Sequence, residues 1–353
     1  MCWFEEDGTI ELFDPAARRT FLKRTTPLEK IQLSDLRVGA AVTIMARPMA
    51  VVEHIGEVTQ QYFAAEAGVS LALILPDALL VAGAILDSIV AAGLQIGRMR
   101  MLQFSQASAS ELTSEVGTAR GEALRLAEHK LQHLLQDACL AVEVSGPDAV
   151  SALQALAGPA DPAIAAEVAP ASIRALYGTD QVQRAVHVSA TPEAAKQELS
   201  LVFDRRRVDE PEQYTHCAVC IIKPHAVRDH AHGRIITAIL GAGLELASVR
   251  SLSLSRKDAS DFLECYRGVL PEWQATLDSL TDGPAVVLCV RGQDVVHRLR
   301  ELAGPYNTEI AKHLAPTSLR ARFGVDAAWN GVHVTDLPDD GPLEAKYLFQ
   351  VAM

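Results

Sequence analysis

An internal duplication constrains the fold of this chain more than any other sequence feature. Residues 158–178 match residues 304–324 at a constant offset of 146, and ten of the 21 positions are identical. Further segments match at offsets of 146 to 148, and these pairs are Val186–Val188 with Val332–Val334, Glu198 with Glu344, and Leu73–Ala78 with Ile221–Ala226. The 353 residues therefore contain two repeats of about 140 residues, each the size of one domain.

Each repeat alternates strand-like and helix-like segments. In the second repeat the strands are expected at Ala218–Ile222, Leu246–Leu254 and Pro284–Val290. The helices are expected at Gly233–Ala242, Arg256–Tyr266 and Gln293–Ala303, and Gly243 and Gly304 follow two of them as C-caps. This order predicts an α/β (α+β) class with two tandem ferredoxin-like βαββαβ domains. The first repeat follows the same order from Leu71 to Phe203.

Residues outside the repeats complete the predicted organisation. Residues 1–66 match neither repeat, and the Asp7-Gly8 turn beside alternating apolar residues indicates a small, mostly β domain. Residues 204–214 are charged and predict a linker. We therefore expect an N-terminal β domain at 1–66, repeat domains at 67–203 and 215–353, and the linker between the repeats.

Composition excludes several classes of function. The net charge of −12 disfavours a general nucleic-acid binder, which usually carries a basic excess. The most apolar stretch, Leu71–Ile96, contains Pro76, Asp77 and Asp87, so it predicts a buried strand and helix and no membrane span. Acidic residues follow Met1 closely, so no signal peptide is expected, and six scattered cysteines suit a reducing compartment. Cys217-Ala-Val-Cys220 has redox spacing but lies in an apolar run, so we expect a core strand.

Charged and nucleophilic residues in the second repeat suit phosphoryl transfer, which needs cations around the phosphates and a nucleophile in line with the γ-phosphorus. His333 is the candidate nucleophile, and Glu344, eleven residues on, is placed to fix its tautomer. Lys223, Arg300 and Arg320 are candidate phosphate ligands. From spacing alone a lone histidine is more often structural, and the arginines equally suit solvated or paired positions.

The second repeat resembles the nucleoside diphosphate kinases. Ile222-Lys-Pro-His-Ala226 is similar to the segment that opens those enzymes, and Asn330-Gly-Val-His-Val-Thr335 is similar to their active-site segment. The resemblance implies phosphorylation of His333, orientation by Glu344, and Thr335 in place of a serine. It implies a Mg²⁺-nucleotide held by matched residues, namely Lys223, Tyr266, Arg300, Arg320 and Asn330, with Trp273 stacked on the base.

Both repeats depart from this pattern. In the second, His225 replaces an aspartate, and Tyr306 replaces a phosphate-contacting threonine. The first repeat keeps the counterparts of the histidine, its glutamate, one arginine and the serine, which are His187, Glu198, Arg174 and Ser189. It lacks the lysine, the second arginine, the threonine and the asparagine, because Leu75, Gln154, Ala160 and Arg184 stand at those positions. We therefore expect the first repeat to be a scaffold with a degenerate site, in which His187 has a structural role or none.

The N-terminal segment resembles a DM-ten domain, here without its opening strand. Its residues Asp7–Asp14 and Arg19–Thr25 carry the likeness. A DM-ten domain followed by two kinase-like domains is the order found in the ciliary family of nucleoside diphosphate kinase homologue seven. That resemblance implies a microtubule inner protein of the axoneme of cilia or flagella, with tubulin, other doublet-microtubule proteins and the γ-tubulin ring complex as partners. The basic residues Arg18, Arg19, Lys23 and Arg24 then suit either contact with acidic tubulin or a solvated hairpin face.

Two functions of different classes follow from these resemblances. One is a structural protein of the doublet microtubule whose second repeat binds nucleotide and at most phosphorylates itself. The other is an active kinase that transfers the γ-phosphate of a nucleoside triphosphate to a diphosphate through phospho-His333.

Overall fold

The computed structural model describes residues 1–4, 6–15, 18–27, 31, 36, 41–45, 47–51, 68–112, 121–204, 214–270 and 272–352. These residues separate into an N-terminal unit, Met1–Ala67, and a second unit, Gly68–Met353. Within the second unit, the first repeat is described over 68–112 and 121–204, and the second over 214–270 and 272–352. Most of the predicted linker, residues 205–213, lies outside the described residues.

The N-terminal unit contains two small antiparallel sheets, in agreement with the expected β content. One has the order β1-β2-β3 and the other is a β4-β5 hairpin; their strands are β1 (Cys2–Phe4), β2 (Thr9–Asp14), β3 (Arg19–Thr25), β4 (Ala41–Ile44) and β5 (Arg47–Ala50). Alternation along β2 buries Ile10 and Leu12, which pack with Ile31, Val42 and Ile44. On the opposite face of β2, Thr9 and Glu11 are half-buried and Phe13 is exposed, and most of β3 is exposed.

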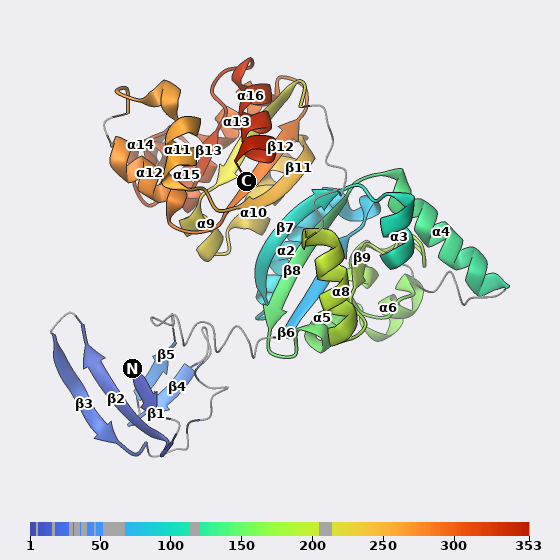
Figure 1. Cartoon of the computed structure of the whole chain (residues 1–353), viewed down its shortest axis with the longest axis horizontal. Coiled ribbons are helices and arrows are strands. Elements are labelled where there is room, and N and C mark those ends of the chain that lie inside the picture. The colour runs from blue at the N-terminus through green and yellow to red at the C-terminus, as the bar shows by residue number, and fades with distance from the viewer. Residues whose placement is uncertain are drawn as a thin grey trace. The chain divides into compact units, whose positions relative to one another are not determined.

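The first repeat has the predicted βαββαβ core with additional helices (Figure 1). The strands among its described residues are β6 (Gly68–Ile74), β7 (Gln95–Leu102), β8 (Cys139–Gly146) and β9 (Val186–Val188). Its helices are α2 (Ala82–Ala91), α3 (Gln106–Leu112), α4 (Glu122–Gln136), α5 (Ala149–Ala157), α6 (Pro162–Val168), α7 (Ile173–Tyr177) and α8 (Pro192–Leu199), with short turns η2 (Pro76–Val81) and η4 (Ser200–Asp204).

The second repeat has the same architecture, which confirms the predicted fold class. Its strands are β10 (Cys217–Ile222), β11 (Glu245–Leu252), β12 (Ala285–Arg291) and β13 (Val332–Val334). Its helices are α9 (Pro224–Arg228), α10 (His232–Gly241), α11 (Arg256–Phe262), α12 (Trp273–Thr281), α13 (Val295–Ala303), α14 (Thr308–Leu314), α15 (Leu319–Phe323) and α16 (Asp340–Lys346), with turns η5 (Glu264–Tyr266) and η6 (Tyr347–Val351). The helix expected over 256–266 therefore ends at Phe262 and continues as the 3-10 turn η5.

The two repeats share one sheet. Its order is β13-β10-β12-β11-β7-β8-β6-β9, and β11 pairs antiparallel with β7 where the repeats meet (Figure 1). On one face, α2 and α10 pack so closely that a Cβ on Gly83 would lie 2.4 Å from the carbonyl oxygen of Gly233. One apolar cluster runs through both repeats on that face, and separate clusters fill the other face of each repeat.

The predicted core strand at Cys217–Cys220 is confirmed. Cys217 lies in the cluster on one face of the sheet and Cys220 in the cluster on the other, and both are free thiols. None of the described helices is both long and apolar enough to cross a membrane.

Candidate nucleotide and phosphoryl-transfer site

His333 and Glu344 lie together in the second repeat. His333 is on β13, where it pairs with Ile221 of β10, and its Nε2 is 3.6 Å from Glu344 Oε1. The hydroxyl of Thr335 donates to Glu344 Oε2 and accepts from the N–H of Val219 at 2.7 Å. The bond from Val219 of β10 thus fixes Thr335, and Thr335 in turn fixes the carboxylate of Glu344, which faces the imidazole of His333.

Two aromatic rings meet the imidazole of His333 edge-on. The ring centroid of Phe262 is 5.1 Å away and that of Tyr266 is 6.2 Å away. The hydroxyl of Tyr266 donates to Asp336 Oδ2 at 2.5 Å, and burial together with Asp336 raises its pKa. Phe262 and Asp336 were not singled out from the sequence. Asp336 follows Thr335 directly and Phe262 lies four residues before Tyr266, so closeness in sequence to predicted site residues was the available signal.

A cavity of about 1040 Å³ opens beside these groups, large enough for a nucleotide-sized ligand. It brings together six of the predicted site residues, which are Lys223, Tyr266, Arg300, Arg320, Asn330 and His333. Tyr306 and Asp336 also line it. Trp273 is not among the lining residues; it begins α12 and packs, partly buried, against the apolar cluster to which α11 and α12 contribute.

Lys223 is buried directly after β10, with 2% of its surface exposed. Its Nζ donates to the carbonyl of Ala328 at 2.6 Å and to Ser279 Oγ at 3.1 Å. Burial, and secondarily the nearby Arg320, lowers the pKa of this ammonium to about 7. An anion in the cavity would favour the charged form of Lys223.

The two predicted arginines have different surroundings. Arg320 is buried, and it donates from Nη1 to the carbonyl of Gly304 at 2.8 Å and from Nε to that of Val332 at 3.3 Å. Arg300 is half-exposed and donates from Nη1 to the carbonyl of Asp336 at 2.8 Å. Arg320 therefore supports the fold as well as the cavity, while Arg300 has more freedom to turn toward a ligand.

Asn330 and Tyr306 both line the cavity and contact each other. Asn330 Nδ2 donates to the carbonyl of Tyr306 at 3.1 Å, and its buried Oδ1 has no partner among the described residues. The guanidinium carbon of Arg320 lies 5.6 Å from the centroid of the Tyr306 ring. The Tyr306 ring therefore occupies space next to a predicted phosphate ligand.

His225 takes over a backbone contact that an aspartate makes in the first repeat. Its Nε2 accepts from the N–H of Gly331 at 3.2 Å, just as Asp77 Oδ2 accepts from the N–H of Ala185 at 2.9 Å. Burial, and next Lys223, lowers the pKa of His225 to about 4, so the ring is a neutral acceptor at neutral pH.

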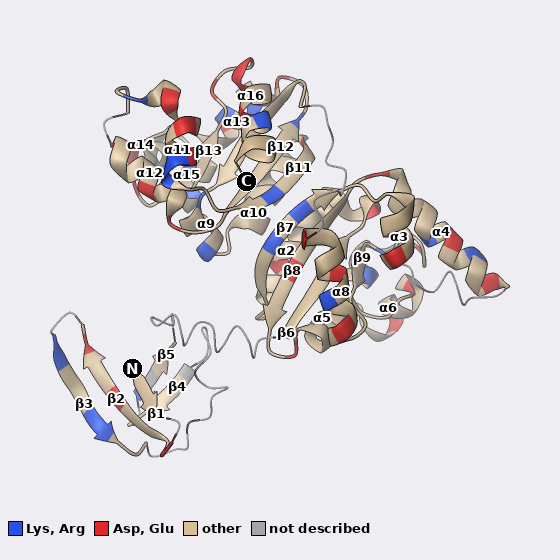
Figure 2. Ribbon diagram, in the orientation of Figure 1, with Lys and Arg blue, Asp and Glu red and all other residues tan. Residues whose placement is uncertain are grey.

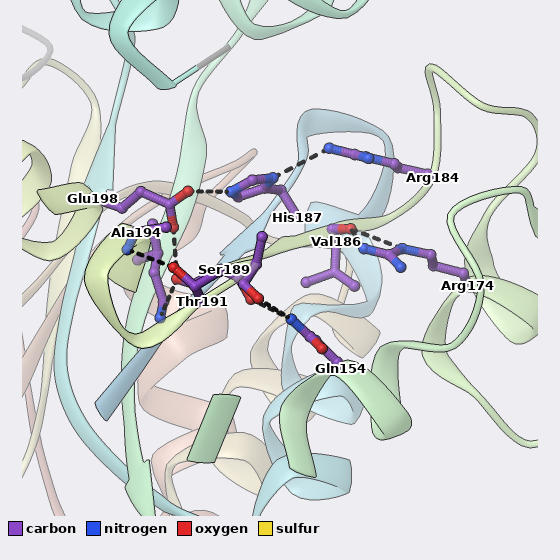
Figure 3. Close-up of polar contacts among 11 residues, drawn as sticks. Gln154, Arg174, Arg184, Val186, His187, Ser189, Thr191, Ala194 and Glu198 are labelled. Atoms are coloured by element: carbon purple, nitrogen blue, oxygen red, sulfur yellow. Dashed lines mark hydrogen bonds and ion pairs between the residues drawn. The ribbon is translucent and has the colours of Figure 1, made fainter. Parts of the chain in front are cut away.

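The first repeat keeps the histidine, its carboxylate and one arginine of the site, but lacks the counterparts of Lys223 and Arg300 (Figure 3). His187 Nε2 is 3.1 Å from Glu198 Oε1, and Ser189 donates to Glu198 Oε2 at 2.6 Å. Arg174 donates to the carbonyls of Gly158 and Val186, which correspond to the two acceptors of Arg320. Gln154, at the position of Arg300, donates to the carbonyls of Ser189 and Ala190, as Figure 3 shows.

Comparison with known proteins places both repeats in one family. The family model described as nucleoside diphosphate kinase matches residues 68–208 and 216–352. Nucleoside diphosphate kinase homolog 7 of Rattus norvegicus is 34% identical over 99% of this chain and 88% of its own length, and that of Mus musculus is 33% identical with the same coverage. A nucleoside diphosphate kinase of Aquifex aeolicus is 30% identical over 36% of this chain and 90% of its own length.

Coverage of nearly the whole chain, the N-terminal unit included, distinguishes the homolog 7 proteins from the single-domain enzyme. Two kinase domains joined in one sheet after a small β unit are the arrangement described above. The chain therefore belongs to the nucleoside diphosphate kinase homolog 7 family.

Proposed function

We propose that the second repeat binds nucleoside di- and triphosphates and transfers a γ-phosphoryl group through His333. The observation that carries this proposal is the placement of His333, with Glu344 behind it, on the cavity that Lys223, Arg300 and Arg320 also line. A nucleophile, a partner for its second nitrogen and three cations are the components that phosphoryl transfer requires.

In the proposed reaction, His333 Nδ1 attacks the γ-phosphorus of a nucleoside triphosphate. The new N–P bond forms as the bond between the γ-phosphorus and the bridging oxygen breaks, and the nucleoside diphosphate leaves. The ring becomes positively charged, and its Nε2–H donates to Glu344, which stabilises that charge. An incoming diphosphate then takes the phosphoryl group from Nδ1 in the reverse sense.

The residues fit a magnesium ion that arrives with the nucleotide. Among the described residues, no group of three or more His, Cys, Asp or Glu side chains is arranged to hold a metal ion, and Asp336 on the cavity is already engaged by Tyr266 and Arg300. Magnesium, which is commonly held through substrate phosphates, would neutralise charge on the β- and γ-phosphates. Lys223, Arg300 and Arg320 would bind the remaining phosphate oxygens, and Asn330 would contact the ribose.

Labelling with γ-labelled ATP tests this proposal. The His333→Ala chain should lose acid-labile label, whereas His187→Ala should keep it. Glu344→Gln should slow labelling by a factor that corresponds to on the order of 1.5–3 kcal/mol, because the charged ring loses its carboxylate partner. The matched change Glu198→Gln should have no effect on labelling. Label that persists in His333→Ala would refute the assignment.

A second function, assembly into the doublet microtubule of cilia, is favoured by the surface of the N-terminal unit. β3 exposes Arg19, Lys23 and Arg24, and Figure 2 shows Lys and Arg in blue along the strand. Phe13 and Phe21 on β2 and β3 are 54% and 59% exposed. Basic and aromatic side chains on one hairpin suit a protein partner with an acidic surface, such as tubulin, although the whole chain carries a net charge of −12.

Fractionation of axonemes tests the second function. A protein bound inside the doublet should stay on salt-washed doublets, because buried sites exchange slowly. A chain without residues 1–66 should incorporate less efficiently, as should one in which Arg19 and Lys23 are replaced by Glu. Recovery of the intact protein only in the soluble fraction would reject this function and leave a soluble kinase as the better account.

A further inference from the structure

Tyr306 connects two segments that line the cavity of the second repeat. Its hydroxyl and that of Thr276 share a hydrogen bond of 3.3 Å, and both residues are part of the cavity lining. Thr276 lies on α12, whereas Tyr306 precedes α14, so the bond bridges elements that are distant in sequence. Ala160 stands at the position of Tyr306 in the first repeat, and its methyl side chain cannot form such a bridge.

The bridge adjoins two of the predicted phosphate ligands. At one end, the guanidinium carbon of Arg320 lies 5.6 Å from the centroid of the Tyr306 ring. At the other end, the carbonyl of Thr276 accepts from Ser279 Oγ at 2.8 Å, and Ser279 Oγ accepts from Lys223 Nζ at 3.1 Å. Contacts therefore run from Arg320 through Tyr306, Thr276 and Ser279 to Lys223.

Lys223 and Arg320 together favour an anion that contacts both of them. Both cations are buried, and burial, followed by the charge of Arg320, lowers the pKa of Lys223 to about 7. A bound phosphate relieves this repulsion. Such a phosphate meets the side chain of Tyr306, because that side chain contacts the guanidinium and is linked to the lysine through the bridge.

The backbone of Tyr306 is fixed, whereas its side chain has room to turn. Asn330 Nδ2 donates to the carbonyl of Tyr306 at 3.1 Å, and the side chain of Asn307 caps the first turn of α14 directly afterwards. The Tyr306 residue is 38% exposed. Rotation of its ring breaks one neutral hydrogen bond, to Thr276, and one contact between a cation and an aromatic ring, while the backbone stays in place.

We propose that Tyr306 is a gate at the phosphate-binding end of the cavity, and that nucleotide enters only after the bond to Thr276 breaks and the ring turns away. The inference rests on the nucleotide site proposed above for the second repeat. A ligand that binds only the open form loses apparent affinity in proportion to the open fraction. The gate closes the free protein, so it slows association and leaves the dissociation of bound nucleotide unchanged.

Stopped-flow kinetics with the full chain and Mg²⁺ test the gate. The probe is the 5′-diphosphate of 2-aminopurine riboside, because its fluorescent base leaves the ribose and the phosphates unmodified. Tyr306→Phe keeps the ring and removes the bond, so its association rate constant should rise about two- to tenfold, the factor that corresponds to one neutral hydrogen bond, with unchanged dissociation. Tyr306→Thr also removes the ring and should give at least as large an increase.

Variants of Thr276 separate the bond from other effects of the tyrosine. Thr276→Val should raise the association rate constant as much as Tyr306→Phe does, and Thr276→Ser, which keeps the hydroxyl, should behave as wild type. The double variant Tyr306→Phe, Thr276→Val should show no further increase, because both changes remove the same bond. Tyr177→Phe, which removes the hydroxyl of a half-buried tyrosine on α7 of the first repeat, is the control and should leave the rate unchanged.

The possible outcomes distinguish the gate from the proposed function. Equal association rates in wild type, Tyr306→Phe and Tyr306→Thr would overturn the gate and leave nucleotide binding intact. Faster dissociation with unchanged association in Tyr306→Phe would show that the hydroxyl contacts bound nucleotide, and would also overturn it. Absence of binding in every chain would overturn both the nucleotide site and its gate. Faster association without acid-labile label on His333 would support the gate and refute only phosphoryl transfer.

Discussion

The imidazole of His225 accepts a hydrogen bond at Nε2 from the backbone N–H of Gly331, over a distance of 3.2 Å. Gly331 has φ +81°, and a Cβ there would lie 3.1 Å from the backbone of Phe323. The contact therefore fixes a tight turn two residues before His333, and it requires an unprotonated Nε2. Asp77 and Ala185 form the equivalent contact in the first repeat.

His225 makes the folded chain sensitive to acid. The ring has a pKa of about 4 in the folded protein, below the ordinary 6.5. Burial is the main cause; Lys223 and Arg228 lower the pKa further, and Asp229 and Asp326 oppose them. Between these values the unfolded chain takes up a proton that the folded chain does not, so stability present above pH 6.5 is lost as the pH falls toward 4. The loss is at most on the order of 3 kcal/mol.

The variant His225→Asp tests this origin of acid sensitivity. A carboxylate keeps the acceptor for Gly331, so the variant should lose less stability than wild type between pH 6.5 and 4.5 in urea unfolding. His232, also with a pKa of about 4, should maintain part of the dependence in both chains. His313→Asp on the exposed surface of α14 is the control and should leave the pH dependence unchanged. Identical curves for wild type and His225→Asp would contradict the prediction.

Nucleotide binding should be coupled to protonation of Lys223. Its pKa of about 7 should rise when phosphate binds nearby. Binding at pH 8 should therefore take up protons, and affinity should fall as the pH rises above 7. Calorimetric titration in buffers of different ionisation enthalpy measures this uptake. Lys223→Leu, which introduces the residue of the first repeat, should bind nucleotide more weakly and without proton uptake. Unchanged proton uptake in that variant would show that another group takes up the proton.

Exchange of Arg300 and Gln154 tests which repeat binds nucleotide. Arg300→Gln should weaken binding of a nucleoside diphosphate by about 1.5–3 kcal/mol, because a charged contact to phosphate is lost. Gln154→Arg is the reciprocal control and should not create a second binding site, because Leu75 and Arg184 remain. Calorimetric titration of both full-length variants gives affinity and stoichiometry. Wild-type affinity in Arg300→Gln would remove Arg300 from the site.

The contact between α2 and α10 should be intolerant of side chains. A Cβ on Gly83 would lie 2.3 Å from Thr237 Oγ1, so Gly83→Ala should destabilise the chain by about 1–3 kcal/mol. Gly241 on the same α10 has nothing within 4 Å of such a Cβ, so Gly241→Ala should be neutral or slightly stabilising. Urea unfolding of the two variants provides the comparison, and equal stabilities would show that the helices separate easily.

The sequence by itself determined the repeats, the fold of each, and most members of the candidate site. These features are encoded locally, because hydrophobic periodicity places strands and helices, and the 146-residue offset carries His187 onto His333 and Glu198 onto Glu344. The 146-residue offset also identified Gln154 and Arg184 as departures in the first repeat, and the offset of 148 identified Leu75. Helix ends were less certain: the segment 256–266 breaks at Phe262, where periodicity alone predicts continuation.

Only the tertiary structure decided the relations between distant segments. Pairing of β7 with β11 joins the repeats into one sheet, and no local pattern in either strand specifies its partner. Trp273 packs against an apolar cluster and is not among the cavity-lining residues. Arg184 contacts His187 Nδ1. Packing and turn geometry, which spacing does not encode, direct both side chains. Likewise, the pKa values of Lys223 and His225 depend on burial, a property of the folded chain and not of the sequence motif.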